Sequence, residues 1–275
     1  MTDVTAPMYG SAWFAALDDG ATRATGLPGS LRYGATRLGD ETAAVVAVVP
    51  DPQARFGRAR HGEVGLEEGY ALARAVTDLV QRDAGAERRR PLVIVVDVPS
   101  QAYGYLEELV GLHQALAAST NAIAQARLAG HPVVTLVVGK AISGAFLATG
   151  LQANRIVALD HDGIAVQVMS KQSAARITRR TIEELDRAAE TVPAMAYDGA
   201  SFARLGAVSE LVRPERPADP TAADVAAVRA ALERAVVAAR ASSPDLSSRL
   251  ESDGAREQRA ASRLVRERVA AAWDA

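Results

Sequence analysis

The chain contains no cysteine among its 275 residues. Disulfide bonds, thiolate metal sites and a cysteine nucleophile are therefore excluded. The four histidines share no spacing that is typical of metal ligands, and they are His61, His113, His131 and His161. The sequence consequently predicts no histidine metal site.

A strong excess of charge of either sign is also absent. The 31 Lys and Arg residues nearly balance the 33 Asp and Glu residues, for a formal net charge of −2. This balance argues against a nucleic-acid partner or a charged membrane surface as partner. No apolar run is long enough to span a membrane, and the first ten residues lack the basic and apolar pattern of a signal peptide. We therefore expect a cytoplasmic protein.

Apolar sequence is plentiful, at 49% of the residues, which is enough for one large α/β domain. The predicted strands cover residues 42–49, 92–98, 132–138, 155–159, 163–168 and 208–212. The predicted helices cover residues 67–81, 107–128, 145–151, 171–206 (with a break near Pro193), 222–241 and 254–273. Strands that alternate with helices at this spacing predict βα units around a parallel sheet. The predicted division is an irregular N-terminal segment with one short helix (1–40), the main domain (41–212), and a linker with C-terminal helices (213–275).

The segment Gly139–Gly144 is rich in small residues and connects a predicted buried strand to a helix, so we expect a tight turn there. The first turn of a helix leaves backbone N–H groups unpaired, and small side chains let a ligand approach them. We predict that the amides of Ala141, Ile142 and Gly144 stabilise negative charge during catalysis, with Ile142 near the first helical position. Further substrate-binding positions in this turn are predicted at Gly139, Lys140 and Ser143. The alternative, that the small residues only permit close packing, stays open.

A second turn follows the predicted strand 92–98, and both turns are expected at the same edge of a parallel sheet, where ligands bind. Ser100, Gln101 and Tyr103 in this turn are predicted to contact substrate or partner. Lys171 and Gln172 are predicted to line the same cleft.

Two residues of the first turn have alternative interpretations. Ser143 is interpreted as a helix cap rather than a nucleophile, because the G-x-S-x-G pattern is absent. Lys140 and Lys171 are the two lysines of the chain. Lys140 either pairs with a carboxylate near the turn or reaches into solvent.

Residues 97–104 resemble the Asp-Thr-Pro-Gly-Ala-Tyr-Pro-Gly segment of acetyl-CoA carboxylase carboxyltransferase alpha subunits, and residues 131–159 resemble the strand, Gly-Glu-Gly-Gly-Ser-Gly-Gly turn and helix that follow it. Two departures are Pro99-Ser100 in place of Pro-Gly and Ala141-Ile142 in place of Gly-Gly. The combination of VDVPSQAYG, GKAISGAFLATGLQANRIVAL and MSKQSAARITRRTIEEL instead resembles the gamma subunit of biotin-independent malonate decarboxylase. This resemblance covers about residues 40–212.

The resemblance implies a crotonase-like ββα spiral with a C-terminal helical extension. It implies pairing with a beta subunit to decarboxylate malonyl-S-acyl-carrier protein to acetyl-S-acyl-carrier protein and CO2. The chain would bind no cofactor directly and use no biotin, because the thioester is carried on the prosthetic group of the carrier protein. The other implied partners are the acyl-carrier protein (delta) and acyl-carrier transferase (alpha) subunits.

Three alternatives remain beside this reading of the resemblance. They are a biotin-dependent acyl-CoA carboxyltransferase alpha-type subunit, a non-catalytic scaffold for the beta subunit, and, most distantly, a Clp-like peptidase. Which subunit supplies the donors to the enolate oxygen also stays open.

Overall fold

The computed structural model describes residues 8–20 and 25–273, and in these residues one sheet of seven strands forms the centre of the fold. The strands are β1 (Leu31–Leu38), β2 (Glu41–Val48), β3 (Leu92–Val98), β4 (Val133–Ile142), β5 (Arg155–Leu159), β6 (Ala165–Gln167) and β7 (Glu210–Val212). Their order in the sheet is β1-β2-β3-β4-β5-β7, with β6 paired to the end of β4. β1 and β2 are antiparallel and every other pair is parallel. The predicted parallel sheet is therefore confirmed.

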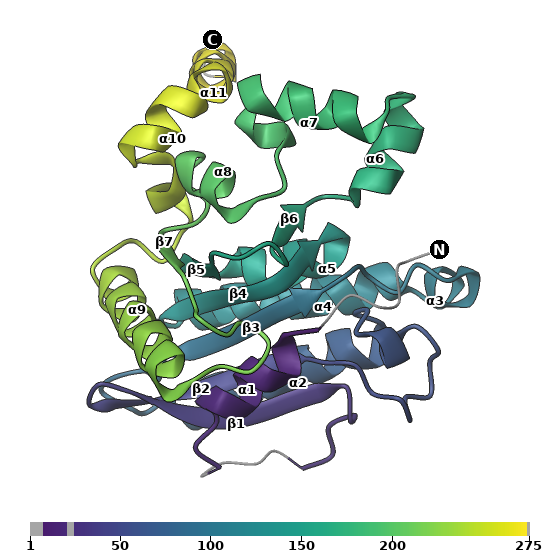
Figure 1. Cartoon of the computed structure of the whole chain (residues 1–275). Helices are drawn as coiled ribbons and strands as arrows, with labels where there is room; N and C mark the ends of the chain where they lie inside the picture. Colours follow the sequence, from purple (N-terminus) through teal and green to yellow (C-terminus); the bar gives the residue numbers. More distant parts are fainter. Residues whose placement is uncertain (1–7, 21–24, 274–275) are drawn as a thin grey trace.

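The α-helices of the described residues are α1 (Gly10–Leu17), α2 (Leu66–Arg82), α3 (Tyr105–Leu109), α4 (Leu112–Leu128), α5 (Ser143–Ala148), α6 (Lys171–Thr178), α7 (Ile182–Thr191), α8 (Gly199–Arg204), α9 (Ala222–Arg240), α10 (Asp253–Gln258) and α11 (Ala260–Trp273). Short 3₁₀ helices are η1 (Ala59–His61), η2 (Gly150–Gln152), η3 (Pro193–Met195) and η4 (Ser247–Leu250). Figure 1 shows α1 and α9 on one side of the sheet and α2 and α4 on the other. Helices α6, α7, α8, α10 and α11 form a separate group beyond β6 and β7.

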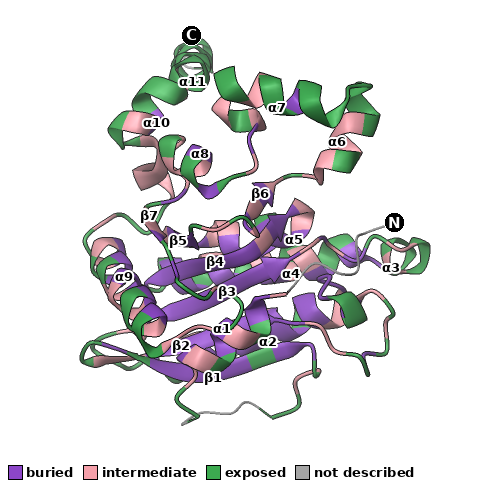
Figure 2. Cartoon of the chain, viewed as in Figure 1, coloured by how far each residue is buried: buried purple, intermediate pink, exposed green. Residues whose placement is uncertain are grey.

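The core lies between the sheet and the helices that cover it. All seven residues of β3 are buried, as a β-branched run covered on both faces predicts. Figure 2 shows the same burial along the central strands, while the helices beyond β6 are mostly exposed. None of the helices in residues 8–20 and 25–273 is long and apolar enough to cross a membrane.

Two sequence predictions are wrong in this part of the fold. The lead-in predicted as irregular contains α1, which matches the expected short helix, and also β1, which was not expected; residues 1–7 and 21–24 lie outside the described residues. β1 escaped prediction because Arg32 and Arg37 interrupt its apolar residues, although they are its two exposed positions. The predicted helix 107–128 is two helices, because Gly111 takes a left-handed φ of 96° between them.

The C-terminal part also differs in detail. The predicted helix 171–206 is divided into α6, α7 and α8, with η3 at the expected break near Pro193. α9 packs against β4, β5 and β7 of the sheet, so residues beyond 213 contribute to the core. The division of the chain at residue 213 stays a prediction.

Candidate functional site

The carboxyl ends of β3 and β4 meet at one edge of the sheet, where their ladder is irregular. Val96 pairs with Val137, but Val98 pairs with Ala141, so β4 holds two extra residues in this stretch. In such a bulge some backbone groups do not pair with the neighbouring strand. Here the Lys140 amide of β4 forms its hydrogen bond with the Asp97 side chain of β3 instead.

Asp97 is that side chain, and three backbone N–H groups donate to its buried carboxylate. The Lys140 amide donates to Oδ1 at 2.9 Å, the Gly10 amide donates to Oδ2 at 3.0 Å, and the Tyr9 amide also donates to Oδ2. Burial raises the pKa of the Asp97 carboxyl, and the three hydrogen bonds oppose that shift. A Cβ at position 139 would lie 2.2 Å from Oδ1, so Gly139 makes room for the carboxylate. The predicted substrate contact of Gly139 stays a prediction.

Ala141 and Ile142 lie in a strand and not in the predicted turn. Ala141 lies between Val98 of β3 and Val166 of β6, and Ile142 also pairs with β6. The prediction of a tight turn is therefore wrong for residues 139–142, because β6 supplies a second partner that extends β4. Ile142 does lie near the first helical position, as predicted, because it is the N-cap residue and α5 begins one residue later, at Ser143. The main chain of Ala141 therefore lies between β3 and β6, whereas the strand partner of Ile142 is Gln167 of β6.

Ser143 makes the sharp change of direction from β4 into α5. Its φ of 66° is left-handed, which is uncommon for a residue other than glycine. The Oγ hydroxyl donates to Gln101 Oε1 at 2.5 Å, and the Gly144 N–H donates to the same oxygen at 2.9 Å. The predicted role of Ser143 as a helix cap is wrong: Ile142 occupies the N-cap position, and the first-turn N–H of Gly144 is bound by the side chain of Gln101 instead. A nucleophilic role lacks support as well, because the hydroxyl faces an amide oxygen and not a base.

Gln101 is held in place from the opposite side by a short bridge to Val64. The Val64 N–H donates to Ser100 O at 3.1 Å, and the Ala102 N–H donates to Val64 O at 2.9 Å. Ser100 is buried and Gln101 is half-buried. The structure thus brings together predicted site residues from both turns, and we call Gln101, Ser143 and Gly144 the carboxamide cluster.

The other two predicted residues at this edge are Tyr103 and Lys140. Tyr103 is 51% exposed, and the Arg58 guanidinium lies 4.2 Å from its ring centroid while pairing with Glu63 at 3.2 Å. Lys140 is half-buried, and its ammonium group makes no ion pair within residues 8–20 and 25–273. The predicted ion pair with a carboxylate is therefore not formed. The positive charge of Lys140 does act on Asp97, where it opposes the rise in pKa that burial causes.

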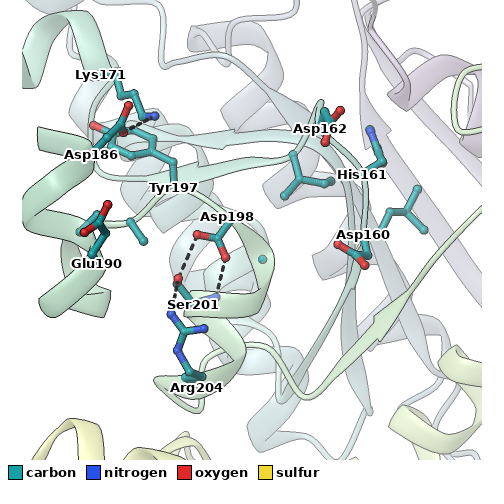
Figure 3. Close-up of a pocket in the computed structure, with 15 residues that line it drawn as sticks. Asp160, His161, Asp162, Lys171, Asp186, Glu190, Tyr197, Asp198, Ser201 and Arg204 are labelled. Carbon is teal, nitrogen blue, oxygen red and sulfur yellow. Dashed lines mark hydrogen bonds and ion pairs between the residues drawn. The ribbon is translucent and has the colours of Figure 1, made fainter. Parts of the chain in front are cut away.

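Lys171 and Gln172 lie elsewhere. Lys171 lines an open cavity of about 570 Å³, where its Nζ lies 2.5 Å from Asp186 Oδ1 and 5.5 Å from the ring centroid of Tyr197. Figure 3 shows this pair at one side of the cavity. None of residues 139–145 lines the cavity, and Gln172 is exposed on α6 outside it. The structure therefore does not bring Lys171 and Gln172 into one cavity with the carboxamide cluster.

The lining of this cavity is mainly acidic, with five carboxylates and two cations. These are Asp160, Asp162, Asp186, Glu190 and Asp198, with Lys171 and Arg204. His161 accepts a hydrogen bond from the Gly163 N–H at Nδ1, so its Nε2 carries the proton that bonds Val138 O at 3.1 Å. This lining disfavours a carboxylate ligand. The described residues contain no group of three side chains that is arranged to hold a metal ion.

Two residues that organise the edge were not predicted as site residues. Asp97 is the single carboxylate in the buried run 92–98, and that was an available signal, because a buried charge needs partners. Arg58 stacks on Tyr103 from a distant loop, and no local pattern of the sequence predicts this contact.

Comparison with known proteins assigns a family. Residues 59–273 match the family described as malonate decarboxylase gamma subunit. The chain is also 40% identical over 192 residues to the malonyl-S-ACP:biotin-protein carboxyltransferase MADD of Malonomonas rubra. That alignment covers 67% of this chain and 64% of MADD, so the chain spans a little under two thirds of this relative's length.

Solved structures show the same likeness. A chain of a Pseudomonas malonate decarboxylase hetero-tetramer in complex with coenzyme A is 47% identical, with a TM-score of 0.88 over 95% of this chain and 99% of that chain. A chain of the Pseudomonas MdcD-MdcE hetero-dimer is 44% identical, with a TM-score of 0.84 and the same coverage. Transcarboxylase 12S is 21% identical, with a TM-score of 0.61 over 83% of this chain and 40% of that chain, which shows the fold alone. The predicted crotonase-like α/β fold is confirmed.

Proposed function

The chain belongs to the family of malonate decarboxylase gamma subunits, and we propose from this premise that it decarboxylates malonyl thioesters together with a beta subunit. The proposed substrate is malonyl-S-acyl-carrier protein, and the products are acetyl-S-acyl-carrier protein and CO2. The observation that carries the proposal is the match of 95% of this chain to subunits of solved malonate decarboxylase assemblies. The acyl-carrier protein and acyl-carrier transferase subunits are the further partners that we propose.

The reaction needs alignment and charge stabilisation more than it needs a titratable side chain. The bond between the carboxylate carbon and Cα breaks, and its electron pair forms the C=C bond of an enolate while the thioester π pair moves onto oxygen. CO2 leaves, and a proton from solvent then adds to Cα. One preorganised donor to the oxygen that becomes negative lowers such a barrier by about 3 kcal/mol.

We place the reacting group at the edge formed by the carboxamide cluster. Lys140 offers an ammonium group that makes no ion pair with the described residues, which suits the carboxylate of the substrate. Ser100 and Tyr103 flank Gln101 on the approach to this edge. In this arrangement Ala141 and Ile142 support the edge from inside the sheet, and Gly144 acts through Gln101. The acidic cavity at Lys171 is the less suitable place for a malonyl group.

Transfer of the carboxyl group to biotin is the second candidate function, because MADD is named as a malonyl-S-ACP:biotin-protein carboxyltransferase. We favour decarboxylation without biotin for two reasons. The paired glycines of the carboxyltransferase turn are replaced by Ala141, whose main chain lies between β3 and β6, and by Ile142, which pairs with Gln167 of β6. The matched malonate decarboxylase chains are also more similar and are covered almost completely.

The two functions differ in where the carboxyl group goes. We expect the chain and its beta subunit to convert malonyl carrier protein to acetyl carrier protein with one CO2 released per turnover, at the same rate with or without avidin. Mass spectrometry of the carrier protein and detection of CO2 measure both products. Turnover that requires a biotinyl protein, and that stops when avidin is added, would favour the carboxyltransferase.

A further inference from the structure

Five arginines gather beside the segment that connects α9 to α10. They are Arg127 of α4, Arg155 of β5, Arg249 of η4, Arg259 at the end of α10 and Arg266 of α11. None of the five forms an ion pair with the residues that the structure describes. Burial, together with the positive charges of three of the other arginines, lowers the pKa of Arg249 to about 10. An anion among these side chains would oppose that shift and stabilise the cluster.

Backbone carbonyl oxygens hold two of these guanidinium groups. Arg127 is buried and donates from Nη1 to Pro244 O, and Arg249 donates from Nη2 to Ala153 O. The Nε atom of each arginine is buried and has no hydrogen-bond partner among the described residues. Buried donors are nearly always paired in proteins. The two side chains therefore have donor groups to offer to a ligand.

An open cavity of about 430 Å³ lies beside these side chains, and we call it the arginine cavity. Arg249, Arg259 and Arg266 line it, and Asp245 is the single carboxylate in the lining. The Asp245 carboxylate accepts hydrogen bonds from the Ser247 N–H at 2.8 Å and from the Ser247 hydroxyl at 2.5 Å. The other lining residues are Leu246, Ser247 and Leu250. With three arginines and one aspartate, the lining has the opposite sign of charge to the chain as a whole, which favours an anionic ligand.

The chemistry of the lining favours a phosphate group over a carboxylate. A guanidinium group presents its donors in a planar fork that matches two oxygens of either group. A phosphate has enough oxygens and charge to engage several such forks, whereas a carboxylate has two oxygens and one charge. The cavity is also large enough for a small organic group, to which Leu246 and Leu250 offer an apolar contact.

We propose that the arginine cavity is a binding site for a phosphate group, either as inorganic phosphate or as the ester of a small organic molecule. The contact of Arg249 with Ala153 places the site beside the start of β5, at the edge of the sheet opposite the carboxamide cluster. Phosphate bound here would not meet the malonyl group, so the site is independent of the proposed decarboxylation. It would connect η4 to α10 and α11, and would hold these C-terminal helices against the sheet.

Isothermal titration calorimetry tests this site on the complete chain in complex with the beta subunit, with inorganic phosphate and phenyl phosphate as probes. Chloride keeps the ionic strength constant, so that charge screening does not change during the titration. We expect saturable binding of one phosphate group per chain, with the lower Kd for phenyl phosphate if an ester is the ligand. Arg259→Gln and Arg266→Gln should each raise Kd about tenfold or more, because each removes a charge-assisted hydrogen bond. Neither side chain forms a hydrogen bond or ion pair within the described residues, so both variants should fold.

Arg268→Gln is the matched control, because it removes the same charge from an exposed position of α11 that does not line the cavity. It should bind phosphate as the wild type does. Saturating phosphate should also raise the melting temperature of the wild type by at least about 2 °C more than that of Arg259→Gln. Comparing the two proteins removes the general stabilisation that phosphate gives to folded chains.

Each outcome decides one point. Heats that do not saturate with the wild type, or a Kd that rises as much in Arg268→Gln as in the two cavity variants, would overturn the phosphate site. Binding to the chain alone that disappears in the complex would also overturn it, because a group of the partner then occupies the cavity. Absence of malonyl turnover by the wild-type pair would overturn the proposed function and leave the phosphate site standing.

Discussion

At the scale of single residues, the candidate site depends on a few side chains whose partners lie far away in the sequence. Asp97 fixes the end of β3 to β4 and to the start of α1, and Gly139 is the residue that allows it. Gln101 fixes the turn at Ser143. Both contacts join residues more than 40 positions apart, and in both a side-chain oxygen accepts a hydrogen bond from a backbone amide.

Gly139→Ala tests the first of these contacts. The added Cβ would lie 2.2 Å from Asp97 Oδ1, so the carboxylate must move and lose hydrogen bonds. We expect the free energy of unfolding to fall by about 3 kcal/mol, measured by urea denaturation. Gly57→Ala is the matched control, because its Cβ would meet nothing within 4 Å, and it should change stability by less than about 0.5 kcal/mol. Equal stability of the two variants would show that Asp97 does not need this space.

At the scale of elements, α9 is the helix that joins the C-terminal part of the chain to the core. Leu232 is fully buried in this helix, whereas Val237 on the same helix is 65% exposed. We expect Leu232→Ala to lower the free energy of unfolding by about 2–5 kcal/mol, because it leaves a cavity against the sheet. Val237→Ala should change it by less than about 0.5 kcal/mol. A small effect at both positions would mean that α9 is an appendage and that the main domain ends near residue 212, as the sequence suggested.

Most elements could be predicted from the sequence because their pattern is local. β3 was predicted at its true bounds from a continuous apolar run, and α2 from helical spacing. The break at Gly111 and the length of β4 were missed, because a left-handed glycine and pairing with β6 depend on tertiary contacts. α5 begins at Ser143, two residues before the predicted helix 145–151, and the predicted functions of the amides beside it stay predictions.

The candidate site could be predicted in part. The sequence placed Gln101 and Ser143 at one edge of a parallel sheet, and the structure joins them with a hydrogen bond. It could not show which atom of Gln101 faces the turn, because that depends on a contact across two strands. Lys171 was expected at the same cleft, but the path of the chain after β6 carries it to a separate cavity.

At the scale of the whole molecule, the chain exposes apolar surface that is expected of a subunit rather than of an isolated protein. No residue of α3 or α11 is buried. Their large exposed apolar residues are Tyr105, Leu106, Leu109, Leu264, Val265, Val269 and Trp273. This surface, together with a candidate site that offers few groups of its own, supports the proposal of an active site shared with a partner.

The most direct test of a shared active site is a titration of the beta subunit into a fixed amount of this chain, with the rate of malonyl carrier protein decarboxylation as the readout. Each protein alone should show little turnover. The rate should rise with added beta subunit and saturate near one beta subunit per chain, the ratio that the hetero-dimer of the Pseudomonas relatives suggests. Full turnover by either protein alone, or a rate that does not depend on their ratio, would contradict the account.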